Sequence, residues 1–263
     1  MSRYTISNIK QKFTKQEKLV VVAAYTKSMA ELADQYSDMI LVGDSLGMVL
    51  YGMESTLPVD MNLMINHGKA VVNFTSKSLI IVDMPFGSYQ VSKEETFKNA
   101  AKIMKRTGAN AVKLEGGVEF QESIEFLTKR GIAVMGHVGL LPQSVNQLGG
   151  YKFQGKDKKS EAQIIKDAVA IEAAGAFAIV VEGVKKEVVA KLKKKINIPL
   201  IGIGAAKECD GQVLVANDLL GMSENVAKFV KKYANLREDI DSAFKQYASE
   251  VRAKKFPESK HTY

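Results

Sequence analysis

Short apolar runs alternate along this chain with longer segments in which apolar residues recur at helical spacing. The runs are continuous rather than interrupted by polar residues, which is typical of strands buried on both faces of a parallel sheet. Strands are predicted near residues 18–25, 39–44, 79–84, 111–116, 133–138, 178–183, 199–204 and 212–217. Eight strands that alternate with helices predict an α/β fold, a (β/α)8 TIM barrel.

Capping residues indicate where two of the helices begin and end. Ser92 and Glu95 have the spacing of a capping box, and Gly108 is suited to end the helix that follows them. The same device is predicted at residues 160–163 (Ser-Glu-Ala-Gln), before a helix that Gly175 would end. Apolar residues follow each box at helical spacing, so both helices can pack against the barrel.

Both ends of the chain extend beyond what a barrel requires. Residues 5–17 are predicted to form a helix that covers one end of the barrel, opposite to the end where the loops after the strands converge. Residues 223–255 are predicted to contain an added helix that packs against a neighbouring subunit. No linker or compositional break divides the chain, so one catalytic domain is predicted over residues 1–263.

The composition favours a cytoplasmic protein. No apolar run reaches about 18 residues and no charged-then-apolar leader is present, so neither a membrane span, a membrane partner nor a secretory signal is expected. The single Cys209 excludes an intrachain disulfide and fits a reducing compartment. It has no CxxC spacing and no nearby histidine, so we interpret it as an incidental thiol.

The net charge of +8 raises the question of a nucleic-acid partner. The lysines are concentrated in the segments 184–196 and 225–233, where they alternate with apolar and acidic residues as on a solvated helix face. No arginine-rich tract, aromatic RNA-binding motif or zinc-finger spacing accompanies them, so no nucleic-acid partner is expected. A noncatalytic RNA-binding scaffold remains an alternative, as does a surface that attracts a polyanionic small molecule.

Acidic residues follow several of the predicted strands, where the loops of a barrel converge. Asp44, Asp83 and Glu115 occupy such positions. Carboxylates about 5 Å apart repel by roughly 3 kcal/mol per pair at an effective dielectric constant near 20, so a cluster of three favours a bound cation. Oxygen ligands without cysteine suit Mg²⁺. The alternative is that Asp44 and Asp83 cap the helices that follow their strands.

Three further residues are candidates for the chemistry. Lys113 lies two positions before Glu115, so both side chains leave one face of the strand, and Lys113 could bind a substrate carboxylate or an enolate oxygen. The alternative is a structural Lys–Glu pair. Glu182 is placed to act as a general base or to cap a helix. His137 could donate a hydrogen bond or be a core histidine.

The loops exclude some common enzyme classes. Residues 140–156 form a long loop, rich in glycine and amide residues, with the composition of an active-site lid. GIGA at 202–205 lacks the third glycine of a dinucleotide fingerprint, and GxxxxGK[ST] does not occur.

Several blocks of the sequence resemble the 3-methyl-2-oxobutanoate hydroxymethyltransferase family. They are VGDSLGMVLYG (42–52), DMPFGSYQ (83–90), VKLEGG (112–117), GHVGLLPQSVNQLGGYKFQGK (136–156), VVEGV (180–184), IGIGA (201–205) and DGQVLV (210–215). They occur in family order, and the block at 136–156 is long and specific. The resemblance implies a (β/α)8 barrel that binds Mg²⁺ and uses 5,10-methylenetetrahydrofolate as the one-carbon donor.

By this resemblance the enzyme would transfer a hydroxymethyl group to 3-methyl-2-oxobutanoate through a Mg²⁺-assisted enolate. The product would be 2-dehydropantoate (ketopantoate), in pantothenate and coenzyme A biosynthesis. Homo-oligomers, often decamers, are also implied. The roles that carry over are metal ligation by Asp44, Asp83 and Glu115, binding of the keto acid by Asp44, Ser45, Asp83 and Lys113, proton abstraction by Glu182, and a substrate contact from His137.

Two positions depart from the family pattern, and one related family is a rival. Thr26 follows Tyr25 where the family usually has an aspartate soon after this tyrosine, and Ala206 replaces a glycine in GIGAG. Both bear on loop shape and folate affinity more than on the chemistry. The rival is a Mg²⁺-dependent lyase similar to isocitrate lyase, but the KKCGH-like cysteine loop of those enzymes is absent.

Overall fold

The computed structural model describes residues 3–263 of the chain. It contains two compact units, Met1–Val215 and Ala216–Tyr263. The first unit holds the eight strands, and the second holds the C-terminal helix. The single domain predicted over residues 1–263 stays a prediction.

Eight parallel strands close into a barrel in the order in which they occur along the chain. Each strand pairs with the next, and the last pairs with the first. The strands are β1 (Leu19–Ala23), β2 (Met39–Val42), β3 (Leu79–Asp83), β4 (Ala111–Lys113), β5 (Val134–Gly139), β6 (Ala178–Glu182), β7 (Leu200–Ile203) and β8 (Gly211–Val215). All eight predicted strands are confirmed, and so is the TIM-barrel fold.

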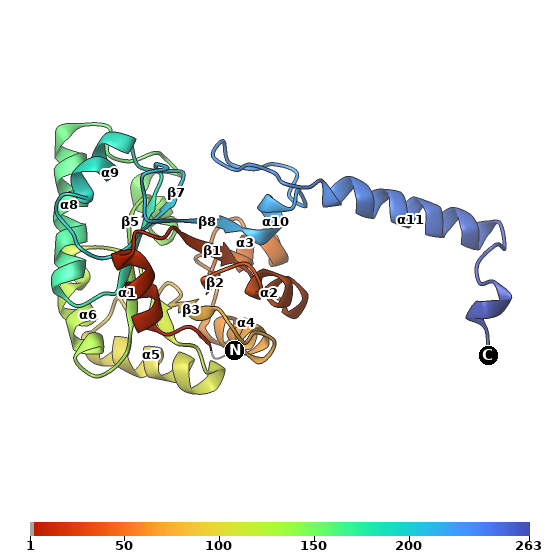
Figure 1. Cartoon of the computed structure of the whole chain (residues 1–263), viewed down its shortest axis with the longest axis horizontal. Coiled ribbons are helices and arrows are strands. Elements are labelled where there is room, and N and C mark those ends of the chain that lie inside the picture. The colour runs from red at the N-terminus through yellow and green to blue at the C-terminus, as the bar shows by residue number, and fades with distance from the viewer. Residues whose placement is uncertain (1–2) are drawn as a thin grey trace. The chain divides into compact units, whose positions relative to one another are not determined.

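Helices surround the barrel, as Figure 1 shows for α5, α6, α8 and α9. Every residue of β2 and β3 is buried, because one face of each strand points into the barrel and the other meets the helices. The helices of this unit are α1 (Ile6–Thr14), α2 (Lys27–Asp34), α3 (Leu46–Tyr51), α4 (Met61–Asn73), α5 (Lys93–Thr107), α6 (Gln121–Thr128), α7 (Val145–Leu148), α8 (Lys158–Ala173) and α9 (Lys186–Leu192). Short 3-10 turns, η1 (Val118–Phe120) and η2 (Pro142–Ser144), complete it.

Ser92 and Gly108 bound α5 as predicted, whereas the predicted start of α8 needs a correction. The Ser92 hydroxyl accepts a hydrogen bond from the Glu95 amide, and Gly108 ends α5 in the left-handed conformation. Helix α8 begins after Asp157 rather than at Ser160, because the Asp157 carboxylate accepts the Lys159 and Ser160 amides. Ser160 is the third residue of the helix, and its hydroxyl accepts the Asp157 amide.

The N-terminal helix α1 lies against the amino ends of the strands, as predicted. Its N-cap, Thr5, forms a capping box with Asn8, and Ile9 is buried. Just before the helix, Arg3 donates to the backbone carbonyls of Ser78 and Thr75, next to the start of β3. These bonds attach the segment before α1 to the amino end of β3.

The second unit contains α10 (Ala216–Leu219), α11 (Leu236–Arg252) and η3 (Ser259–His261). Helix α11 is the predicted C-terminal helix, and none of its residues is buried. Four exposed apolar residues recur along it at helical spacing: Ile240, Phe244, Tyr247 and Val251. Its packing against a neighbouring subunit stays a prediction. Across residues 3–263, no helix combines the length and the apolar character that crossing a bilayer demands.

Candidate active site

The carboxyl ends of five consecutive strands, β2 to β6, bring the predicted site residues together. Asp44 and Ser45 follow β2, Glu115 follows β4, and Asp83, Lys113, His137 and Glu182 lie within strands. Glu182 is partly exposed, whereas the remaining ionisable side chains are buried in the barrel mouth. The buried members are Asp44, Asp83, Lys113, Glu115 and His137.

Asp83 and Lys113 form a buried ion pair. They are register partners on β3 and β4, and Lys113 Nζ lies 3.2 Å from Asp83 Oδ2. The same oxygen accepts the Asp44 amide at 3.1 Å. The other oxygen, Asp83 Oδ1, is buried without a hydrogen-bond partner. A buried carboxylate oxygen is costly to leave unpaired, so Oδ1 is a strong candidate to bind a ligand.

The carboxylates of this cluster destabilise one another's ionised forms. Burial raises the pKa of Asp44 to about 8, and the charges of Asp83 and Glu115 act in the same direction. Burial also raises the pKa of Asp83, although Lys113 opposes the change. Burial alone would lower the pKa of Lys113, but Asp83, Glu115 and Asp44 outweigh it and raise that pKa, so the ammonium stays charged. Further positive charge would therefore be stabilised here.

His137 connects Glu115 with Glu182. Its Nδ1 lies 3.4 Å from both Glu115 Oε1 and Lys113 Nζ, and its Nε2 lies 3.2 Å from Glu182 Oε2 without hydrogen-bond alignment. Burial and Lys113 would lower the pKa of His137, but the two glutamates outweigh them and raise it. A protonated Nδ1 can donate to Glu115 and cannot accept from Lys113, so we assign the Nδ1 contact to Glu115. Burial would raise the pKa of Glu115, but the hydrogen bond and charge of His137, together with Lys113 and the backbone amide of Gln143, outweigh it and lower that pKa.

The structure excludes the helix-cap alternatives. Helix α3 begins after Ser45, α4 after Asp60 and α9 after Lys185, so neither Asp44 nor Glu182 occupies an N-cap position. Asp83 is not one either, because α5 begins after Ser92. The Lys–Glu alternative is also wrong, since the ion pair of Lys113 is with Asp83.

Ser45 lies beside the cluster and is held by a tyrosine. Its Oγ is 2.7 Å from the hydroxyl of Tyr25, a buried residue that follows β1. Ser45 makes no side-chain capping bond to α3, so its hydroxyl is not used by the helix. Substrate contacts by Ser45 and by the other predicted residues stay predictions.

Gln143 and Tyr89 belong to the site although the sequence did not reveal their roles. Gln143 is buried, and its Nε2 donates to Asp44 Oδ2 at 2.7 Å, while its backbone amide donates to Glu115 Oε2 at 2.9 Å. The Tyr89 hydroxyl donates to Gln143 Oε1 at 2.6 Å. Both residues lie in family-like blocks, at 83–90 and 136–156, which was the one available signal.

The predicted lid loop, residues 140–156, runs beside the end of β6. The Leu140 amide donates to the Glu182 carbonyl, and the Gln154 amide donates to the Gly183 carbonyl, both at 2.8 Å. The loop leaves β5 through Gly139, whose φ of +97° favours glycine. A Cβ atom at this position would also overlap the Glu182 carbonyl oxygen. The backbone of the loop is thus joined to the strand that carries Glu182; its opening as a lid stays a prediction.

The fit of a metal ion can be judged from the donor set. Among residues 3–263, no group of three or more His, Cys, Asp or Glu side chains is arranged to hold a metal ion. Asp44 and Asp83 nevertheless offer buried carboxylates that are destabilised as anions, and Asp83 Oδ1 has no partner. Such a set fits Mg²⁺, which takes few protein ligands and completes its shell with water or substrate oxygens.

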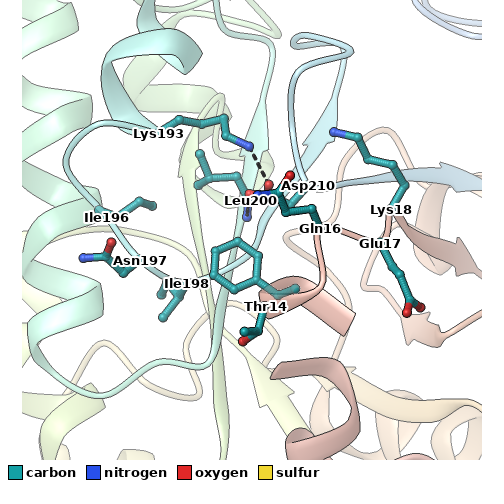
Figure 2. Close-up of a pocket in the computed structure, with 11 residues that line it drawn as sticks. Thr14, Gln16, Glu17, Lys18, Lys193, Ile196, Asn197, Ile198, Leu200 and Asp210 are labelled. Carbon is teal, nitrogen blue, oxygen red and sulfur yellow. Dashed lines mark hydrogen bonds and ion pairs between the residues drawn. The ribbon is translucent and has the colours of Figure 1, made fainter. Parts of the chain in front are cut away.

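A cavity lies at the amino ends of the strands, the end of the barrel opposite to this cluster. It has a volume of about 610 Å³ and is bordered by residues next to the amino ends of β1, β7 and β8. Figure 2 shows that Lys193 faces Asp210 there, and Lys18 donates to the Cys209 carbonyl. Because these charged groups are already paired, and TIM-barrel sites lie at the carboxyl ends of the strands, this cavity is not a candidate active site.

Comparisons with known proteins support the resemblance along the whole chain. The family model for ketopantoate hydroxymethyltransferase matches residues 3–259. The 3-methyl-2-oxobutanoate hydroxymethyltransferase of Bartonella tribocorum is 51% identical over 263 residues, which cover 100% of this chain and 97% of the relative. The enzyme of the same name from Sphingopyxis alaskensis is 50% identical and is covered to 91%.

Solved structures show the same fold at low sequence identity. Phosphonopyruvate hydrolase in complex with oxalate and Mg²⁺ has a TM-score of 0.63 and 16% identity, covering 98% of this chain and 93% of that one. A 2,3-dimethylmalate lyase of the PEP mutase/isocitrate lyase superfamily has a TM-score of 0.59 and 14% identity, covering 94% and 87%. These similarities concern the barrel alone. The match over residues 3–259 and the half-identical relatives of similar length show that the chain belongs to the ketopantoate hydroxymethyltransferase family, a family of transferase enzymes.

Proposed function

We propose that this protein transfers a hydroxymethyl group from 5,10-methylenetetrahydrofolate to 3-methyl-2-oxobutanoate. The product is 2-dehydropantoate (ketopantoate), on the route to pantothenate and coenzyme A. The observation that carries the proposal is the unpartnered Asp83 Oδ1 beside the charged Lys113, in the mouth of a barrel whose family is named for this reaction. The site therefore offers both a cation position and a positive group for an α-keto acid.

Asp44 and Asp83 are the residues that would hold Mg²⁺. Glu115 is the third predicted ligand, but its oxygens already face the Gln143 amide and His137, so it acts more through its charge than through a free oxygen. A bound Mg²⁺ would polarise the keto acid and make its C3–H bond more acidic.

Lys113 and Ser45 are proposed to orient the keto acid. The Lys113 ammonium stays charged and faces the cluster, so it can bind the substrate carboxylate or the oxygen on which negative charge develops. The Ser45 hydroxyl can donate to the substrate while Tyr25 holds it in place.

Glu182 is proposed to take the C3 proton. Its side chain is the most exposed of the site carboxylates, and His137 Nε2 lies 3.2 Å from it, which limits where the carboxylate can point. The methylene carbon is bonded to two folate nitrogens, and both of these bonds break: one is replaced by a bond to C3 of the keto acid and the other by a bond to the oxygen of a water molecule, which becomes the hydroxyl group of the product. The C3 proton and one proton of that water go to the two nitrogens, so tetrahydrofolate is released.

We also infer that the enzyme acts in the cytoplasm as a homo-oligomer, and a decamer is the state that the family resemblance implies. The exposed apolar stripe of α11 supports assembly, and the single Cys209 fits a reducing compartment. Neither a membrane nor a nucleic-acid partner is part of this proposal.

The test is an assay of the purified protein with each co-substrate alone and with both, before and after exhaustive chelation. We expect ketopantoate only when both co-substrates are present, loss of activity on chelation, and recovery with Mg²⁺. Keto-acid turnover without folate would favour a lyase similar to isocitrate lyase. Full activity after chelation would contradict the cation site, and sequence-selective RNA binding without turnover would favour the scaffold.

A further inference from the structure

Gln143 is a neutral loop residue whose side-chain amide is fully hydrogen-bonded among the site carboxylates. It lies in η2, within loop 140–156, and is 5% exposed. Its Nε2 donates to Asp44 Oδ2 at 2.7 Å and to the Met84 carbonyl at 3.0 Å. Its Oε1 accepts from the Tyr89 hydroxyl at 2.6 Å and from Gln90 Nε2 at 3.4 Å. Two donors and two acceptors are the full capacity of an amide.

The surroundings allow only one orientation of this amide. The Met84 carbonyl can only accept, so the nitrogen of Gln143 must face it and Asp44. On the other side, the Tyr89 hydroxyl accepts the Glu115 backbone amide at 3.3 Å, so its own proton is free to go to Gln143 Oε1. A reversed amide would place donor against donor and acceptor against acceptor.

The same residue contacts a second site carboxylate through its backbone. The Gln143 amide donates to Glu115 Oε2 at 2.9 Å. Gln143 therefore binds one oxygen of Asp44 and one of Glu115, on two different strand ends. If loop 140–156 moved away, both buried carboxylates would lose a donor together.

We propose that Gln143 is a positioning residue that couples the seating of loop 140–156 to cation binding at the Asp44–Asp83 site. The inference rests on the proposed cation site. Gln143 fixes the orientation of the Asp44 carboxylate and leaves its second oxygen available. Because coupling between two binding equilibria is reciprocal, a cation that favours this orientation also favours the docked loop. Tyr89 supports the arrangement because its hydroxyl donates to the side-chain oxygen of Gln143 and so fixes the orientation of the side-chain amide.

The test compares the Mn²⁺ affinity of the wild type with that of two variants, using the whole protein without substrate. The EPR signal of free Mn²⁺ measures the binding. Gln143→Met keeps the length of the side chain and the backbone bond to Glu115 but removes the amide. We expect it to bind Mn²⁺ about 10- to 100-fold more weakly, as when a residue that orients a metal ligand is lost. Gln154→Met is the matched control on the same loop. The side-chain amide of Gln154 donates to the Lys152 carbonyl and contacts no site carboxylate, so this substitution should leave the Mn²⁺ affinity unchanged.

Hydrogen exchange of the loop is the second measurement. In the wild type, Mn²⁺ should slow exchange of the amides in residues 140–156, and Gln143→Met should lose this response. A residue needed only for stability would change the exchange rates equally with and without Mn²⁺. An intact Mn²⁺ response in Gln143→Met would overturn the coupling.

Tyr89→Phe keeps the aromatic ring in place and tests the network if Gln143→Met does not fold. We expect about 3-fold weaker Mn²⁺ binding, the size of one modest hydrogen bond, and no further loss when it is combined with Gln143→Met. Unchanged Mn²⁺ binding in every one of these variants that folds would overturn the role of Gln143 but not the cation site. A wild type that binds no Mn²⁺ would overturn the cation site of the proposed function as well.

Discussion

The two ends of the barrel use the same residue type in opposite ways. At the amino ends of the strands, every aspartate that we compare is fully paired. Asp34 accepts the amides of Ser76 and Ser78, each at 2.7 Å, and Asp38 is bound by Lys12 and the Val20 amide. At the carboxyl ends, Asp83 keeps a buried oxygen without a partner.

The pKa values show the same contrast. Burial would raise the pKa of Asp34, but the backbone amides outweigh it and lower that pKa. Burial raises the pKa of Asp44 to about 8, and the charges of Asp83 and Glu115 add to the shift. The hydrogen-bonded aspartates at the amino ends stabilise the fold. The buried carboxylates at the carboxyl ends destabilise it when ionised, and a bound cation would reduce their repulsion. The following experiments test this contrast.

The largest effect is expected at Glu182. Glu182→Gln cannot accept a proton, so we expect exchange of the C3 proton of 3-methyl-2-oxobutanoate into deuterated water to fall by about 10²- to 10⁴-fold. Binding of Mg²⁺ and of the keto acid should be retained. NMR of the keto acid measures the exchange, and an unchanged rate would remove Glu182 from the role of base.

Asp83→Asn and Asp34→Asn form a matched pair from the two ends. Asp83→Asn should weaken Mn²⁺ binding by about 100-fold or more, and it should also destabilise the fold because Lys113 loses its ion-pair partner. Asp34→Asn should lower the free energy of unfolding by about 2–3 kcal/mol, since an amide nitrogen would face backbone donors, and it should leave Mn²⁺ binding of the folded protein unchanged. Mn²⁺ titration and denaturant unfolding distinguish the two, and the contrast fails if Asp34→Asn weakens Mn²⁺ binding as much as Asp83→Asn does.

Stability of the cation-free protein should fall as the pH rises from about 4 to about 8. Native Asp44 has a pKa of about 8 and the reference value is 3.8, so in this window the native state holds a proton that the unfolded state has released. The slope is at most about 1.4 kcal/mol per pH unit for one proton. Asp34, whose pKa is lowered, has the opposite sign: its contribution is present above about pH 4 and is lost as the pH falls through its native pKa.

Chemical denaturation in EDTA between pH 5 and 8 measures this slope. Asp44→Asn should have a flatter profile than the wild type, because it removes the titrating carboxyl, and added Mg²⁺ should flatten the wild-type profile by favouring ionised Asp44. Identical profiles for the wild type and Asp44→Asn would contradict the raised pKa.

The smallest effect is expected for the exposed pair at the amino end. Lys193→Met removes the ion pair with Asp210, and partly exposed pairs contribute about 0–1 kcal/mol. We expect a change of less than about 1 kcal/mol in unfolding free energy and unchanged turnover. Loss of turnover in this variant would show that the cavity in Figure 2 takes part in function.

The barrel could be predicted because strands buried on both faces leave continuous apolar runs. The ionisable site residues could be predicted for a related reason: Asp44, Asp83 and Glu182 lie where such apolar runs end. The start of α8 was misplaced because Asp157 and Ser160 both fit a cap, and only the backbone shows which of them lies outside the helix. Gln143 could not be predicted, since its role depends on five hydrogen-bond partners that lie after β2, β3 and β4.

The glycine at the exit of β5 limits how this enzyme can change. A side chain at position 139 would meet the Glu182 carbonyl and would need an unfavourable backbone conformation. Even Gly139→Ala would push apart the two strands that carry His137 and Glu182. Laboratory evolution toward new keto acids therefore has little freedom at this hinge, and libraries are better placed farther along the loop, where residues such as Tyr151 are exposed to solvent.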